Sequence, residues 1–319
     1  MTEAQPVIFV GGLGRSGTTL LERLLGELPG AVPLGEVVHL WARGVHADEP
    51  CGCGEPFSRC PFWGKVGDLA FGRWTAGEAD RVLRLRAGVD RTRRLPLLAL
   101  GGFPAFGRGR RAAELRAYVS AYASIYAAAA EVADGDWVID SSKHASLACC
   151  LAAAGGTRAR LRVVHVVRDP RAVAASWRSD VTRPEDGRPM ARWAPGRTAV
   201  HWLAQNLAFE LLRRRGVPVV RIRYEDLLLR PAETLRELAA ELGLPLPPGA
   251  LPFLDGREAL LGVAHTVSGN PMRFAVGRVR FSERRVALPP AHRLLVTALT
   301  WPLLLRYGYR PAARAGAAA

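Results

Sequence analysis

Short runs of apolar residues recur along the chain and predict buried β-strands. They lie at Gln5–Gly11, Val32–Glu36, Trp137–Asp140, Leu161–Val167 and Val217–Tyr224. The run LRVVHVV at 161–167 consists mostly of β-branched residues, which suits a strand that is covered on both faces.

Helices are predicted between these strands, and the alternation sets the fold class. They are expected at Thr18–Leu28, Ala112–Ala133, from His144, from Pro170, Thr198–Arg215 and Pro231–Leu242. Alternating strands and helices predict an α/β fold with a mostly parallel sheet and helices on both faces. Ligands of such sheets bind at the carboxyl ends of the strands.

Two stretches break this alternation. Residues 44–110 contain glycines, prolines, three cysteines and arginine-rich pieces, and residues 178–197 are polar and rich in proline and glycine. We interpret both as irregular, substrate-side insertions into a single domain at 1–310. The tail at 311–319 is expected to be disordered.

Composition indicates a folded protein with an anionic partner. Of 319 residues, 49% are hydrophobic and 23% charged, which excludes wholesale disorder. The 44 Lys and Arg residues outnumber the 29 Asp and Glu residues, for a net charge of +15. This balance favours nucleic acid, an acidic membrane or a polyanionic small molecule. The arginines are scattered along the chain, which argues against nucleic acid.

The chain shows no pattern of export or membrane insertion. The start, MTEAQ, has no basic segment, and the apolar stretch Leu294–Leu305 contains Pro302 and is shorter than a membrane span. An odd number of cysteines, five, argues against a secreted disulfide framework. We therefore expect a cytoplasmic enzyme.

The first chemical motif, GGLGRSGTT at 11–19, lies between a predicted strand and a predicted helix. Glycines let a loop turn tightly and expose its N–H groups, and a helix start adds partial positive charge, so the motif predicts a phosphate or sulfate site. Gly12 and Gly17 fit the glycines of a Walker A loop, but Thr18 replaces its lysine. A nucleotide kinase remains an alternative that this replacement disfavours, and a plain glycine turn is the other.

The second motif, RDPRAVAAS at 168–176, begins where the fourth predicted strand ends. Arg168 and Ser176 stand eight residues apart, and a bend into the following helix lets both reach one phosphate. The alternative is a helix-capping Asp-Pro with a surface arginine.

Together the two motifs resemble those of sulfotransferases that use 3′-phosphoadenosine 5′-phosphosulfate (PAPS) as donor. The loop is similar to their 5′-phosphosulfate loop, and 168–176 to their 3′-phosphate motif. YEDL at 224–227 is similar to their signature after the later core strand, and HTVSGNPMR at 265–273 resembles a late segment of bacterial members. The resemblance implies a P-loop-like fold without ATPase activity, transfer of a sulfuryl group to a hydroxyl or amine, and no metal requirement.

The resemblance also implies roles for individual residues. The 5′-phosphosulfate is expected to bind the loop residues Gly14, Arg15, Ser16, Gly17, Thr18 and Thr19, with Arg15 also contributing to catalysis. Arg168 and Ser176 are expected to hold the 3′-phosphate, with Tyr224 near the adenosine and Arg273 as a second cation on that phosphate.

Two further residues are the expected catalytic pair. Lys143 is one of only two lysines in the chain, and it follows a strand end. An ammonium is a compact charge that can follow a shifting oxygen, so we expect Lys143 to act on the bridging oxygen of the donor. Glu36 follows Gly35 in a pair that resembles the proposed base of tyrosylprotein sulfotransferases, although Val37 and Val38 depart from that pattern. His39 and His144 are the alternative bases.

The cysteines allow several interpretations. Cys51, Cys53 and Cys60 lack a fourth metal ligand nearby except His46, and their C-x-C spacing is not the usual zinc-knuckle spacing. Buried thiols or a redox-variable disulfide fit equally well, so we predict no metal ligands. Cys149 and Cys150 are expected in the core.

The acceptor is not identified by any motif. Its expected walls, residues 36–110 and 178–197, contain Trp41, Trp63, Phe103, Phe106 and Trp193, which suggests an aromatic or lipidic pocket. The alternative from another class is a non-catalytic nucleic-acid-binding protein, which the absence of aromatics interleaved with basic residues disfavours.

Overall fold

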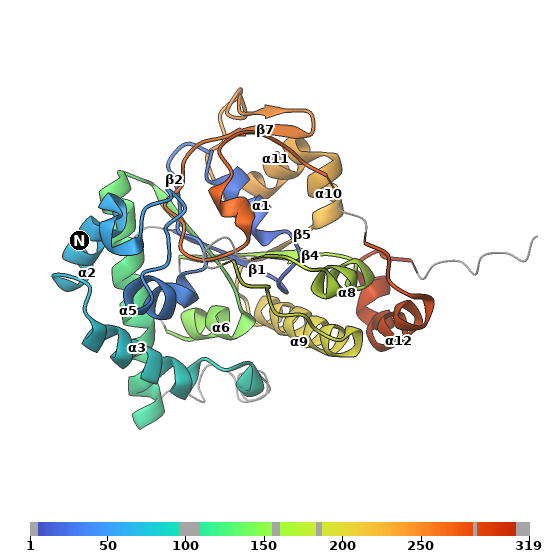
Figure 1. Cartoon of the computed structure of the whole chain (residues 1–319), viewed down its shortest axis with the longest axis horizontal. Coiled ribbons are helices and arrows are strands. Elements are labelled where there is room, and N and C mark those ends of the chain that lie inside the picture. Colours follow the sequence, from blue (N-terminus) through green and yellow to red (C-terminus); the bar gives the residue numbers. More distant parts are fainter. Residues whose placement is uncertain (1–5, 96–108, 155–159, 183–186, 283–285, 311–319) are drawn as a thin grey trace, which may run out of the picture.

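A five-stranded parallel sheet forms the centre of the protein (Figure 1). The computed structural model describes residues 6–95, 109–154, 160–182, 187–282 and 286–310. The strand order is β2-β3-β1-β4-β5. The strands are β1 (Val7–Gly11), β2 (Ala31–Pro33), β3 (Trp137–Lys143), β4 (Leu161–Val167) and β5 (Val219–Arg223). The predicted α/β class is confirmed.

Helices cover both faces of this sheet, because side chains of a strand alternate between its faces. Ile8 and Val10 of β1 pack into one apolar core, beneath α1 (Thr18–Leu25), α10 (Tyr224–Leu229) and α11 (Pro231–Leu242). Val7 and Phe9 pack into the other, with α5 (Arg110–Ala133), α6 (Ala145–Ala153) and α9 (Pro195–Arg214). Helix α8 (Pro170–Arg178) packs with α9 and α12 (Pro290–Arg306) (Figure 1). Cys149 and Cys150 are buried in α6, as predicted.

Three strand ends differ from their predicted positions. Strand β3 continues to Lys143, so Asp140, Ser141 and Ser142 are buried strand residues. Strand β2 has only three residues and ends at Pro33, ahead of Glu36. Strand β5 ends at Arg223, and Tyr224 begins α10.

The prediction of irregular structure at 44–110 was wrong for its described part, which is largely helical. A π-helix (Leu40–His46) leads into this region, and α2 (Pro61–Phe71) and α3 (Ala76–Val89) both pack on α5 (Figure 1). Rings of Trp41, Phe57, Trp63, Phe71 and Trp74 form an aromatic cluster that supplies these helices with a core. Residues 96–108, with Phe103 and Phe106, lie outside the described residues.

The protein also contains a second, smaller sheet that the sequence did not predict. Strands β6 (Leu254–Asp255), β7 (Glu258–Leu261) and β8 (Gly277–Arg280) are antiparallel. The segment between β7 and β8 reaches back to the main sheet, where the Val267 N–H donates to Leu34 O at 2.8 Å and the Glu36 N–H donates to Val267 O at 2.7 Å. This pairing places residues 266–270 beside Glu36.

Two predictions concern the chain beyond the sheets. Within the described ranges, no helix combines the length and apolar character of a membrane span. The predicted disorder at 311–319 falls on residues that the structure does not describe.

Candidate active site

One cavity of about 560 Å³ lies at the carboxyl ends of the central strands, within the usual range of small-molecule sites of about 300–1,000 Å³. Its lining contains five cationic side chains and, among the described residues, one carboxylate, Glu36. The cations are Arg15, Arg43, Lys143, Arg168 and Arg280. This imbalance favours an anionic ligand.

The glycine-rich loop forms one wall of the cavity, and two of its glycines are required by close contacts. Gly12 has φ +150°, and an added Cβ would lie 2.5 Å from Val166 O. Gly17 has φ +92°, and its Cβ would lie 2.1 Å from the Tyr224 ring. Helix α1 begins at Thr18, so its unpaired N–H groups and the positive end of its dipole are at the cavity, which Thr18 and Thr19 line.

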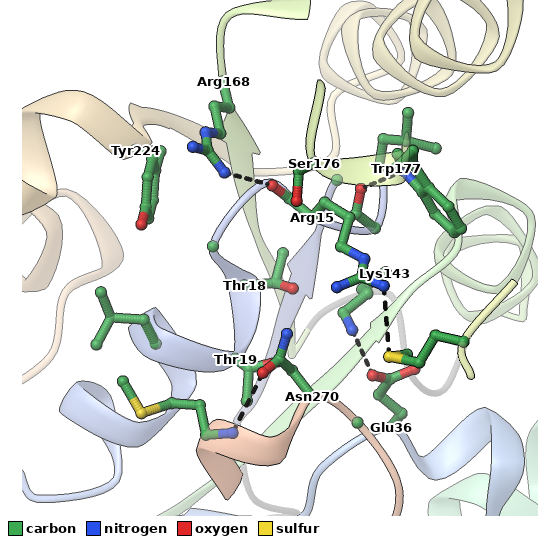
Figure 2. A pocket seen from close by; sticks show the side chains of 18 of the residues that line it. Arg15, Thr18, Thr19, Glu36, Lys143, Arg168, Ser176, Trp177, Tyr224 and Asn270 are labelled. Atoms are coloured by element: carbon green, nitrogen blue, oxygen red, sulfur yellow. Dashed lines mark hydrogen bonds and ion pairs between the residues drawn. The ribbon is translucent and has the colours of Figure 1, made fainter. Parts of the chain in front are cut away.

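The second motif borders the same loop (Figure 2). Arg168 follows β4, donates to Arg15 O at 3.0 Å and lies 4.5 Å above the Tyr224 ring. Asp169 caps α8 by accepting from the Arg171 N–H, and Ser176 of that helix lines the cavity. Trp177 Nε1 donates to Gly14 O at 2.9 Å, which fixes α8 to the glycine loop.

An ion pair joins the two expected catalytic residues. Lys143 Nζ donates to Glu36 Oε1 (Figure 2), and His39 Nε2 lies 3.6 Å from Glu36 Oε2. Burial is the largest single influence on Glu36 and raises its pKa, but the charge and hydrogen bond of Lys143, together with contributions from His39 and His144, lower that pKa below its ordinary value. Burial lowers the pKa of His39 to about 3 and also lowers that of His144, so both rings are neutral at pH 7.

Glu22 of α1 holds the backbone next to Glu36 in place, and the sequence did not identify Glu22 as a site residue. Glu22 accepts from the Gly35 N–H and from Ser141 Oγ, both at 2.6 Å. Burial raises the pKa of Glu22 to about 7. Gly35 has φ +82°, and a Cβ there would lie 2.4 Å from Val267 O. A single glutamate within a predicted helix belongs to no recognisable sequence motif. The position of Glu22 beside Gly35 and Ser141 is therefore known only from the fold.

Asp140 helps to fix the backbone just after Glu36, through Ser142. It accepts from the Ser142 N–H at 2.8 Å, from Tyr126 at 2.5 Å and from Ser142 Oγ. Ser142 Oγ in turn accepts from the Val38 N–H at 2.9 Å. Burial raises the pKa of Asp140 to about 6. Asp140 therefore positions backbone and does not reach the cavity lining.

Backbone strain is concentrated in the cavity lining. Among the described residues, five non-glycine residues have positive φ, and three of them line the cavity. They are Arg15 (φ 74°), Lys143 (φ 70°) and Ser268 (φ 55°). Such conformations cost about 1–3 kcal/mol each and persist where surrounding structure enforces them, often at functional sites.

The cavity brings together most of the predicted site residues. Those in its lining are Gly14, Arg15, Gly17, Thr18, Thr19, Glu36, Lys143, Arg168, Ser176 and Tyr224. Ser16 is buried within the loop, at 1% exposure. The expectation for Arg273 needs correction, because its buried guanidinium donates to Thr266 O at 2.9 Å and to Pro50 O at 2.7 Å. In this position the side chain crosslinks two backbone segments, and it is not among the described residues that line the cavity.

Aromatic residues line the cavity on the side of the predicted insertion at 178–197. Trp177 and Trp193 stack with ring centroids 3.9 Å apart, and Arg15 lies 5.5 Å from the Trp177 ring and donates to Met190 Sδ. Trp193 is among the aromatic residues expected from the sequence, whereas Trp177 is not, although Trp177 directly follows Ser176 in the second motif. Trp41 and Trp63, which it also named, are fully buried core residues.

Comparison with known proteins identifies the family. The model of the sulfotransferase family matches residues 6–248. The chain has no match among curated protein sequences. Solved structures similar to it include the sulfotransferase domain of the Synechococcus PCC 7002 olefin synthase, at 19% identity and a TM-score of 0.47, covering 95% of this chain and 96% of that one. A sulfotransferase from Mycobacterium avium is similar at 14% identity and a TM-score of 0.49, covering 98% of this chain and 79% of that one.

The family match spans the glycine-rich loop, the Lys143–Glu36 pair and the Arg168–Ser176 motif, so it includes most of the residues that line the cavity. On that match the chain belongs to the sulfotransferase family.

Proposed function

We propose that the protein transfers a sulfuryl group from PAPS to a hydroxyl or amine of an organic acceptor and releases adenosine 3′,5′-bisphosphate. One observation carries this proposal. A single cation-rich cavity contains the glycine-rich loop at the start of α1, the pair Arg168 and Ser176, and the pair Lys143 and Glu36. The loop and the Arg168–Ser176 pair suit two separate phosphate-like ends of one ligand. Lys143 and Glu36 add a cation and a base.

The donor is held by the wall that the sheet supplies. The loop N–H groups, Thr18 and Thr19 bind the 5′-phosphosulfate at the start of α1. Arg168 and Ser176 bind the 3′-phosphate, and the Tyr224 ring, against which the Arg168 guanidinium lies, supports the adenosine side. Arg15 lies between this wall and Trp177, where its charge stabilises the sulfuryl group during transfer.

Lys143 and Glu36 divide the chemistry. Without donor the ammonium neutralises Glu36, and the phosphosulfate competes for that ammonium when it binds. Glu36 then loses its cationic partner, its pKa rises, and it becomes a better base for the acceptor hydroxyl. The acceptor oxygen forms a bond to sulfur as its proton passes to Glu36. The sulfur–oxygen bond to the phosphate breaks, and Lys143 stabilises the electron pair left on that oxygen.

His39 is the second candidate base. It is neutral at pH 7 and its Nε2 lies 3.6 Å from Glu36 Oε2, so it can accept a proton directly, but a pKa of about 3 makes it a weak base. His144 lines the same cavity, with its ring centroid 6.1 Å from that of His39. Either histidine as the base would leave turnover largely intact when Glu36 is neutralised.

Calorimetric titration with adenosine 3′,5′-bisphosphate, AMP and ATP tests the proposal. The bisphosphate should bind about tenfold or more tightly than AMP, because charge-assisted hydrogen bonds contribute about 1.5–3 kcal/mol each. Equal affinity for the two would remove the 3′-phosphate assignment. Transfer from PAPS should proceed at full rate without added Mg²⁺, because protein cations act where a kinase uses that ion. ATP consumption that depends on Mg²⁺ would instead indicate a kinase.

A further inference from the structure

Three cysteines and one histidine meet away from the cavity. Cys51, Cys53 and Cys60 come from the loop between the π-helix and α2, and His265 comes from the segment between β7 and β8. One ligand atom of each residue lies within 4.8 Å of all the others. None of the four residues is part of the cavity lining as described.

Four of the six distances between these ligand atoms are close to those of a tetrahedral shell, and the other two are within 4.8 Å. Zn²⁺ binds thiolate at about 2.3 Å and imidazole at about 2.0–2.1 Å, which places sulfur atoms about 3.8 Å apart and sulfur and nitrogen about 3.6 Å apart. Cys60 Sγ lies 3.6 Å from Cys51 Sγ and 3.8 Å from Cys53 Sγ. His265 Nδ1 lies 3.3 Å from Cys60 Sγ and 3.8 Å from Cys51 Sγ. A disulfide needs a sulfur–sulfur distance of about 2.05 Å, and all three cysteines are free.

We propose that Cys51, Cys53, Cys60 and His265 bind one structural Zn²⁺ ion. Binding replaces the three thiol protons, which pass to solvent, and leaves zinc in its ordinary oxidation state. Four protein ligands complete a tetrahedron, so no position remains for substrate, as is usual for a structural site. Cys53 is only partly buried, which gives the ion a route from solvent.

Two glycines let the backbone of the cysteine loop come close to the segment that carries His265. The Cys51 N–H donates to Glu55 O at 2.8 Å and the Gly54 N–H to Cys51 O at 2.9 Å, forming a tight turn in which Gly54 has φ +93°. A Cβ on Gly52 would lie 2.4 Å from Ala264 O, so a side chain there would separate the loop from the segment that carries His265. Both glycines therefore bring the cysteines and the histidine together.

His265 is oriented by two contacts that leave Nδ1 facing the thiols. Its ring stacks on Phe62 with centroids 5.1 Å apart and an interplanar angle of 17°. Its carbonyl accepts from Trp63 Nε1 at 2.9 Å. Phe62 and Trp63 directly follow Cys60 and Pro61, so the start of α2 supplies both a ligand and the support for the histidine.

The sequence alone predicts no metal ligands, because His46 is the only possible fourth ligand near the cysteines. In the structure His46 Nε2 instead bonds to Asp80 Oδ1 at 3.0 Å. His265 stands 205 residues beyond Cys60 and reaches the cysteines only through the fold. The proposed ion acts outside the reaction, so the expectation that transfer needs no metal is unaffected.

The proposed ion braces one wall of the cavity. The Gly52 N–H donates to Thr266 O at 2.9 Å, next to the segment that pairs with Leu34 and Glu36. Arg273 spans the same two regions through Thr266 O and Pro50 O. The metal therefore fastens the cysteine loop to the segment that carries Ser268 and Asn270 into the cavity.

Metal analysis of the full-length protein tests this inference without any donor or acceptor. Protein purified with a reductant and without chelator should contain about one zinc per chain by plasma mass spectrometry. Blocking the thiols with a mercurial should release that zinc to a chromogenic chelator. Cys60→Ser and His265→Ala should lose most of the metal, whereas Cys149→Ala, at a buried cysteine of α6, should retain it.

A second measurement holds even where a ligand variant fails to fold. Metal-free wild-type protein reloaded with Co²⁺ should show thiolate-to-cobalt charge-transfer absorption and the intense visible bands of a tetrahedral site. Wild-type protein that contains no zinc and gives no such bands would overturn the proposal. So would zinc retained in both ligand variants, or a mass two hydrogens lower that reveals a disulfide in freshly prepared protein.

Discussion

The two walls of the cavity are built in different ways. The donor wall consists of the glycine-rich loop, Lys143 and Arg168, each at or just beyond the end of a strand of the parallel sheet. The opposite wall consists of Glu36 and residues 268–270, which hydrogen bonds between distant segments hold in place. The residues of the donor wall can therefore be recognised from local sequence motifs, whereas those of the opposite wall are brought together only by contacts between distant segments.

The largest expected effect comes from the opposite wall. Glu36→Gln removes proton abstraction but keeps the shape of the side chain, so turnover should fall by about 10²–10⁴-fold. Affinity for the bisphosphate should not weaken, because Lys143 is released from its ion pair. Single-turnover rates and calorimetry measure the two quantities. Near-normal turnover would exclude Glu36 as the base and direct attention to His39 and His144.

Lys143→Ala should affect both catalysis and binding. Turnover should fall by about 10²-fold or more, because an electrostatic partner of the leaving oxygen is lost, and bisphosphate affinity should fall as well. Lys143→Arg should rescue only partly, because a planar guanidinium cannot replace a compact ammonium. Lys65→Ala removes the other lysine, which is exposed on α2, and serves as control. An unchanged affinity for Lys143→Ala would place the ammonium away from the donor.

Arg168→Ala should act on binding alone. Affinity for adenosine 3′,5′-bisphosphate should fall about tenfold or more, whereas affinity for AMP should stay the same. Arg236→Ala, at an exposed arginine of α11, is the matched control for loss of one positive charge. A parallel loss of AMP affinity would move Arg168 from the 3′-phosphate to the 5′ side.

The smallest expected effect is on stability, and it concerns Glu22, which fixes the backbone of the opposite wall at Gly35. The pKa of Glu22 is raised to about 7 in the folded protein, above an unfolded value of about 4.3. Its contribution to stability is therefore complete below pH 4.3 and is lost as the pH rises through 7. Glu22→Gln resembles the protonated form, so its melting temperature relative to wild type should rise by a few degrees from pH 5 to pH 8. Glu241→Gln, at an exposed residue, should show no such trend. A constant difference would mean that Glu22 is not protonated near neutral pH.

The sequence predicted the donor wall better than the opposite wall, for a physical reason. Strand β4 and helix α11 have the predicted bounds, because a long β-branched run and a proline-started amphipathic helix are strong local signals. The short strands of the second sheet have no such signal. The positions of His265 and Arg273 depend on contacts with residues more than 200 positions away, which no local pattern encodes.

The pairing of Lys143 with Glu36 has a consequence for selectivity among cellular anions. Any anion that approaches Lys143 must first displace a buried carboxylate. Orthophosphate or free sulfate has only one charged group with which to offset the free energy of displacing Glu36. A ligand with a second phosphate also gains the contacts of Arg168 and Ser176. We therefore expect abundant inorganic anions to be weak competitors, because the resting protein already supplies its lysine with a counterion.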